Sequence, residues 1–177
     1  MTWDKVVWAR ASIPRHAFIA WLYVQRRLPT KVHLCCFLPQ SDLLFPLCTN
    51  AVEDDAHLFT TCPYAIEVWD SLTHWWPLPF GTMQTDMTMA LSKYRAPKAH
   101  QQISYAIFAA TIYFIGNAQN QSIFKGRYIP TRHTVATIKE QIRHRILFLH
   151  SCLCNYSKYL DLILRPYGLF CKHLYLC

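Results

Sequence analysis

The chain has 177 residues, of which 53% are hydrophobic by type and 16% are charged, with a formal net charge of +8. This length suits one domain, or one domain with a small appendage, and the apolar and aromatic content argues against intrinsic disorder. Four glycines and the absence of a tandem motif argue against collagen-like chains and solenoid arrays.

Charge is distributed unevenly along the chain. Residues 1–31 carry six Lys or Arg against one Asp, residues 32–92 carry seven acidic side chains and no Lys or Arg, and residues 93–177 carry twelve bases against two acids. Two interpretations stay open: the acidic middle pairs with its own basic flanks, or the flanks bind a polyanion.

The first predicted helix covers residues 14–28, because Pro14 is a favoured first helical residue and Phe18, Trp21 and Leu22 recur at helical spacing. Residues 26 and 27 are arginines in its last turn, where they suit the helix dipole. A short second helix is expected from Thr30 through residue 37.

The next helix is predicted to begin after Cys62, at Pro63, and to end before the prolines at 77 and 79. Residues 75–98 are rich in proline and look like loop. We therefore expect a boundary near residue 80, between an N-terminal domain (1–80) and a helical C-terminal region (81–177) whose last part (about 151–177) is divergent.

Two long helices are expected in the C-terminal region. Residues 99–124 contain no charged side chain, and their apolar core is too short for a membrane span, so we expect a buried helix rather than a transmembrane one. The following helix is amphipathic and basic. Its apolar positions are Val135, Ile138, Ile142, Ile146, Leu149 and Leu153. No segment alternates as a strand does, so the fold is predicted to be mainly α.

The N-terminus lacks the features of a secretory signal. This predicts an intracellular protein, in the nucleus or the cytoplasm, that is not secreted. Its eight cysteines are then expected to be metal ligands or buried thiols rather than a disulfide framework.

Cys48, His57 and Cys62 form a cluster with metal-ligand chemistry, at the spacing C-x8-H-x4-C. A structural zinc site needs four nitrogen or sulfur donors, and only three are present. On an ideal α-helix, residues 57 and 62 point about 140° apart, so a break at Thr60 and Thr61 is needed for both to face one ion. The alternative is a buried histidine beside two core thiols.

The sequence resembles the zinc-binding domain that follows the reverse transcriptase in plant non-LTR (LINE-type) retrotransposons. Order and spacing agree over about residues 3–76, and more weakly from residue 109 to residue 124. The matching residues are Trp8, Ile13, Pro14, Arg15, His16, Phe18, Trp21, Leu22, Arg27, Leu28, Pro29, Thr30, Lys31, Pro46, Leu47, Cys48, Glu53, Asp55, His57, Leu58, Phe59, Cys62, Pro63, Ala65, Val68 and Trp69.

The resemblance implies short helices around a zinc-knuckle-like loop, followed by longer C-terminal helices. It makes Cys48, His57 and Cys62 the second, third and fourth zinc ligands, and it places Phe45 where the family has the first cysteine. Because phenylalanine cannot ligate zinc, bound Zn²⁺ is expected to be weak or lost. A second departure is the stretch 116–120, where the family usually has a Trp followed by charged residues and Asn.

The implied function is a retrotransposon-derived, non-catalytic module that contacts RNA or DNA, with no membrane and no small-molecule substrate. An enzyme is not expected, because two-metal chemistry needs clustered carboxylates that the sequence does not offer. The alternative is a vestigial retroelement fragment with a degenerate metal site and no selected function. The candidate phosphate contacts are Arg15, Arg26, Arg27, Lys31, Arg132, Lys139, Arg143 and Arg145.

Overall fold

The computed structural model describes residues 3–28, 57–80, 86–153, 159 and 163. Over these ranges the regular secondary structure is all helical, which confirms the predicted mainly α fold, with the longer helices toward the C-terminus. The short helix expected from Thr30 lies outside these residues. The elements are α1 (Asp4–Val7), α2 (Pro14–Val24), η1 (His57–Thr61), α4 (Pro63–Trp75), α5 (Met87–Lys93), α6 (Lys98–Lys125) and α7 (Thr131–Leu153).

Helix α2 begins at Pro14, as predicted, after an extended Ile13. It ends at Val24, earlier than the sequence indicates. The main-chain N–H of Arg27 donates to the carbonyl of Leu22 at 2.9 Å, and Arg26 adopts a left-handed conformation with φ +52°. This is a Schellman-type termination, with arginine at the position that glycine usually occupies.

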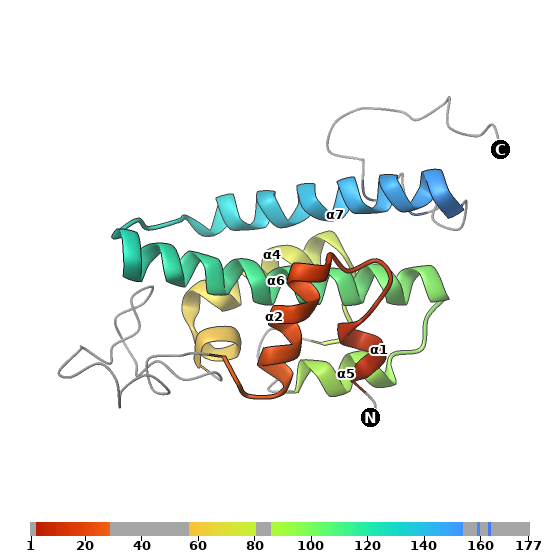
Figure 1. Cartoon of the computed structure of the whole chain (residues 1–177), viewed down its shortest axis with the longest axis horizontal. Coiled ribbons are helices and arrows are strands. Elements are labelled where there is room, and N and C mark those ends of the chain that lie inside the picture. Colours follow the sequence, from red (N-terminus) through yellow and green to blue (C-terminus); the bar gives the residue numbers. More distant parts are fainter. Residues whose placement is uncertain (1–2, 29–56, 81–85, 154–158, 160–162, 164–177) are drawn as a thin grey trace.

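The most buried positions of α2 include its small residues, and one of its large aromatic side chains lies outside. His16, Ala17 and Ala20 are buried, whereas Phe18 is half exposed. Two alanines let the α2 backbone come close to α6, which it crosses (Figure 1). Helical spacing identifies a face but not its partner, and here the smaller residues face the core.

Helix α4 begins at Pro63 and ends at Trp75, within the limits that the prolines predict. Val68, Trp69 and Leu72 are fully buried along one face. Just beyond the helix, Trp76 is also fully buried, and its indole N–H donates to the Ser104 hydroxyl on α6 at 3.0 Å. The Trp76 side chain therefore links the end of α4 to α6.

Helix α6 lies at the centre of the fold. It contacts each of the other helical elements described, and thirteen of its residues are buried, which confirms a core helix. In the described ranges, no helix combines the length and the apolar character that a membrane span needs. The buried residues of α6 include the unbroken run 103–112, so they lie on all sides of the helix rather than along one stripe.

Helix α7 returns along α6 after a connection of residues 126–130, and the two lie side by side (Figure 1). Gly126 ends α6 in a left-handed conformation, φ +58°. Hydrogen bonds tie α7 to α4, because the hydroxyls of Tyr64 and Thr134 lie 2.7 Å apart and the Thr131 hydroxyl donates to Glu67 at 2.7 Å. The buried row of α7 is Val135, Ile138, Ile142, Ile146 and Leu149, as predicted.

One hydrophobic cluster spans both sides of residue 80. It contains Val6 and Ala20 from the first helices together with Ile107 and Ile138 from the last two. The segment 75–98 also contains α5, which packs on α1 and α6. The division at residue 80 stays a prediction about sequence organisation, since the helices on either side of it share this core.

Candidate functional site

The segment between the two described candidate ligands is a π-helical turn. The backbone N–H of Cys62 donates to the carbonyl of His57 at 2.8 Å, which is the i to i+5 bond of a π-helix. This bond returns the chain to the same side of the turn after five residues, whereas an α-helix would separate the two side chains. The break expected at Thr60 and Thr61 is thus a π turn over residues 57–61, followed by Pro63 at the start of α4.

The core holds this turn in place. The indole N–H of Trp69 donates to the Phe59 carbonyl at 2.9 Å, and Leu58, Phe59 and Thr60 are buried. At the surface of the turn, His57 Nδ1 and the Thr61 hydroxyl lie 3.2 Å apart. Cys62 is fully buried. The π turn is therefore anchored by packing within the described part of the chain.

The donor types suit zinc, but their number does not suit a closed structural site. His57 supplies an imidazole and Cys62 a thiol, whereas Cys48 and Phe45 lie outside the described residues. Among the residues that are described, no group of three or more His, Cys, Asp or Glu could hold a metal ion. Three donors of the right chemistry leave one of the four positions of a structural zinc site without a protein ligand.

The candidate phosphate contacts on α2 are exposed. Arg15 lies in the first turn, where its guanidinium carbon is 5.3 Å from the centre of the Tyr113 ring on α6. Arg26 and Arg27 follow the last turn and are exposed as well. Lys31 lies outside the described residues. Helix α2 thus places basic side chains at both of its ends.

Between these ends the outer face of α2 is aromatic. Phe18 is 50% exposed, and its ring centre lies 5.9 Å from that of Trp21. Phe18 comes three residues after Arg15, so the two share a face of the helix. Sequence reasoning assigned Phe18 to helical spacing alone, and only its exposure marks it as a surface residue available for contact.

The candidates on α7 have different surroundings. Arg143 is 9% exposed, and its Nε–H donates to the Ile163 carbonyl at 2.8 Å. The Lys139 ammonium lies 5.5 Å from the centre of the Trp75 ring, and burial together with the nearby Arg143 lowers the pKa of Lys139. These two cations line the inner side of α7.

Arg145 also has structural contacts, because its Nη2 donates to the Arg10 carbonyl at 3.0 Å. Arg132, in the first turn of α7, is exposed. Of the seven candidates that the structure describes, Arg143 is thus buried, and Arg143 and Arg145 donate to main-chain carbonyls. Among those described, the exposed cations are Arg15, Arg26 and Arg27 at the two ends of α2, and Arg132 on α7.

The comparisons with known proteins bear on this N-terminal part of the chain. Residues 1–69 match the family model described as zinc-binding in reverse transcriptase. Over residues 1–69 the chain is similar to a reverse-transcriptase zinc-binding domain. No curated protein and no solved structure matches the chain. The match confirms the resemblance seen in the sequence, and the zinc-binding domain covers α1, α2, η1 and the first half of α4.

Proposed function

We propose that the protein is a non-catalytic module, derived from a plant LINE-type retrotransposon, that contacts single-stranded RNA or DNA through the outer face of α2. The observation that carries this proposal is the exposed basic and aromatic face of that helix. Arg15 and Phe18 share the face, and Arg26 and Arg27 extend it at the C-terminal end. Helix α2 contains no acidic side chain.

Each component of this face suits a part of a nucleic acid strand. Arginines contact phosphates and release the counterions condensed on them, which makes binding salt-dependent. Exposed aromatic rings stack on bases without strong sequence preference. Phe18, next to Trp21, offers such a ring between the basic ends.

The backbone at Arg26 supports a role for its side chain. Its φ of +52° is a left-handed conformation that costs a non-glycine residue about 1–2 kcal/mol. The Schellman-type termination needs this conformation but not an arginine. Any residue other than glycine carries this cost at position 26, and phosphate binding is the role that we propose for the arginine there.

Filter binding of a single-stranded oligonucleotide across a salt series tests the proposal. The double variant Arg26→Ala, Arg27→Ala is expected to bind more weakly and to lower the slope of log affinity against log salt by about 1.4, since each single-strand phosphate contact contributes about 0.7. The matched control is Lys93→Ala, Arg95→Ala, which removes two exposed charges at and just beyond the end of α5. Equal effects of the two double variants would contradict the assignment to α2.

The alternative is that the protein is a vestigial retroelement fragment with a degenerate metal site and no selected function. It is favoured by Phe45, which stands where the family has its first zinc ligand. The salt series separates the two possibilities. Wild-type protein that folds but binds no oligonucleotide at low salt would support the vestigial fragment.

A further inference from the structure

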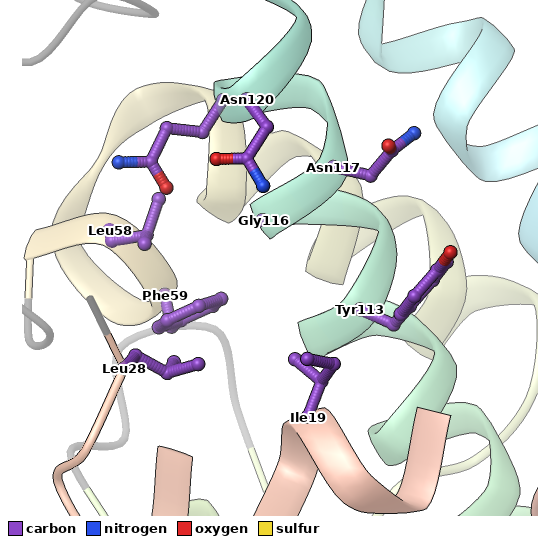
Figure 2. Close-up of a pocket in the computed structure, with 9 residues that line it drawn as sticks. Ile19, Leu28, Leu58, Phe59, Tyr113, Gly116, Asn117 and Asn120 are labelled. Carbon is purple, nitrogen blue, oxygen red and sulfur yellow. The ribbon is translucent and has the colours of Figure 1, made fainter. Parts of the chain in front are cut away.

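A pocket opens between α2, η1 and α6 (Figure 2). Its volume is about 190 Å³, which is several times the roughly 30 Å³ that one water occupies and below the about 300 Å³ at which drug-sized sites begin. In Figure 2, Leu58 and Phe59 border the opening on one side and Tyr113 on the other, while Asn120 lies above it. The space suits one small flat ring.

The pocket exists because α6 has no side chain at Gly116. A Cβ placed on Gly116 meets no atom within 4 Å. Gly116 lies in the interior of α6, where glycine destabilises a helix relative to alanine. The helix therefore leaves space open at a position where a larger residue would fit.

The lining combines apolar and amide groups. Leu58 and Phe59 are almost fully buried and offer an apolar wall. Gln119 is 6% exposed and adds a side-chain amide to the lining. An amide both donates and accepts hydrogen bonds, so it suits a ligand with a polar edge. Asn117 and Asn120 add two further amides around the opening.

Positive charge flanks the pocket on the α2 side. Tyr113 lines it, and the Arg15 guanidinium carbon lies 5.3 Å from the centre of that ring. Leu28 also lines it and directly follows the exposed Arg27. A ligand ring in the pocket would thus have the Arg15 guanidinium near the Tyr113 wall for an attached phosphate.

We propose that this pocket accepts one unstacked nucleobase of a bound single strand. The ring would lie against the apolar wall, and the amides would pair with the edge of the base, as asparagine and glutamine do with adenine. This inference rests on the proposed function and adds to it a base-binding site. It differs from stacking on Phe18, which needs no pocket.

Two single-stranded probes test the inference on the full chain: an oligoadenylate, and the same backbone with abasic residues. The wild type is expected to bind the oligoadenylate about tenfold more tightly, within the range measured for contacts to one base. Gly116→Trp fills the pocket, so the preference should fall several-fold while the salt slope stays unchanged. Gly116→Ala is the matched control and keeps the preference, because a methyl group takes little of the space.

A second variant guards against misfolding of Gly116→Trp. Gln119→Leu replaces the amide with an apolar side chain of similar size, and it should also reduce the preference. If the wild type shows no preference for the oligoadenylate, or if Gly116→Trp and Gln119→Leu keep the wild-type preference, the pocket inference is overturned and the phosphate contacts stand.

Failure of the proposed function gives a different result, because neither probe then binds at any salt concentration. Free adenosine, followed through the NMR signals of the Asn117 and Asn120 side-chain amides, decides the pocket in that case. Binding that Gly116→Trp abolishes supports a base site without a strand. Absence of adenosine binding to the wild type overturns the inference.

Discussion

His16 is a deeply buried titratable group on α2. It is 1% exposed, its ring centre lies 4.5 Å from that of Tyr113 and 5.3 Å from that of Phe114, and its Nε2 has no hydrogen-bond partner. Burial, helped by the neighbouring Arg15, lowers the pKa of His16 from 6.5 to about 4. The folded protein therefore holds His16 as a neutral ring.

This pKa makes the stability depend on pH. Between about pH 6.5 and pH 4 the unfolded chain binds a proton at residue 16 that the folded chain does not, so stability is complete above this window and falls with pH inside it. The total loss is up to about 3 kcal/mol. His16→Phe should remove that part of the pH dependence, measured as the free energy of unfolding in urea from about pH 7.5 to about pH 4. Parallel pH curves for the two proteins would contradict it.

Residue 45 decides the zinc site. Three donors are expected to hold zinc weakly, whereas Phe45→Cys restores the four ligands that the family pattern contains. We expect purified wild type to hold less than stoichiometric zinc and Phe45→Cys to hold about one ion per chain, measured by elemental analysis after dialysis. The control is Phe45→Ser, which offers no thiolate. Stoichiometric zinc in the wild type would show that three ligands suffice.

Two helices end in the same left-handed conformation, one at an arginine and the other at a glycine. Arg26 follows α2 at φ +52°, and Gly126 follows α6 at φ +58° with no atom near a Cβ placed on it. Arg26→Gly is therefore expected to raise the free energy of unfolding by about 1 kcal/mol, and Gly126→Ala to lower it by about the same. Urea unfolding measures both. A change of the same sign in the two variants would refute the backbone explanation.

Helices α2, α4, α6 and α7 show which structural features can be predicted from local sequence. Proline positions predicted where α2 and α4 begin, because a fixed φ and a missing N–H act within one residue. The three- and four-residue steps along α7 predicted its buried row, since its apolar residues are large and continuous. On α2 the rule failed, because Ala17 and Ala20 face the core while Phe18 stays outside. For α6, which is buried on several sides, lack of charge was the better signal.

At the scale of the molecule, α6 joins the zinc-binding domain to the C-terminal helices. The described helices share one cluster, and the Tyr64–Thr134 hydrogen bond joins α4 to α7. Such a core is expected to unfold in one cooperative step.

Ile138→Ala, in the buried row of α7, tests this cooperativity. It should lower the free energy of unfolding by about 2–5 kcal/mol, the range for truncating a buried aliphatic side chain. Tryptophan fluorescence, which sums six tryptophans including the buried Trp69 and Trp76, should change in the same transition as far-UV circular dichroism. The exposed control Ala136→Gly changes only helix propensity, by about 1 kcal/mol. Two separate transitions would instead support independent units on either side of residue 80.

The sequence by itself determined the mainly α fold, the starts of α2 and α4, and the similarity of residues 1–69 to a reverse-transcriptase zinc-binding domain. These depend on residue types and on spacing along one chain, which are local properties. Only the tertiary structure decided which face of α2 is exposed, that Arg143 lies on the buried side of α7, and that a pocket lies beside Gly116 between α2, η1 and α6. Each of these depends on which surfaces meet, and packing between elements distant in the chain sets that.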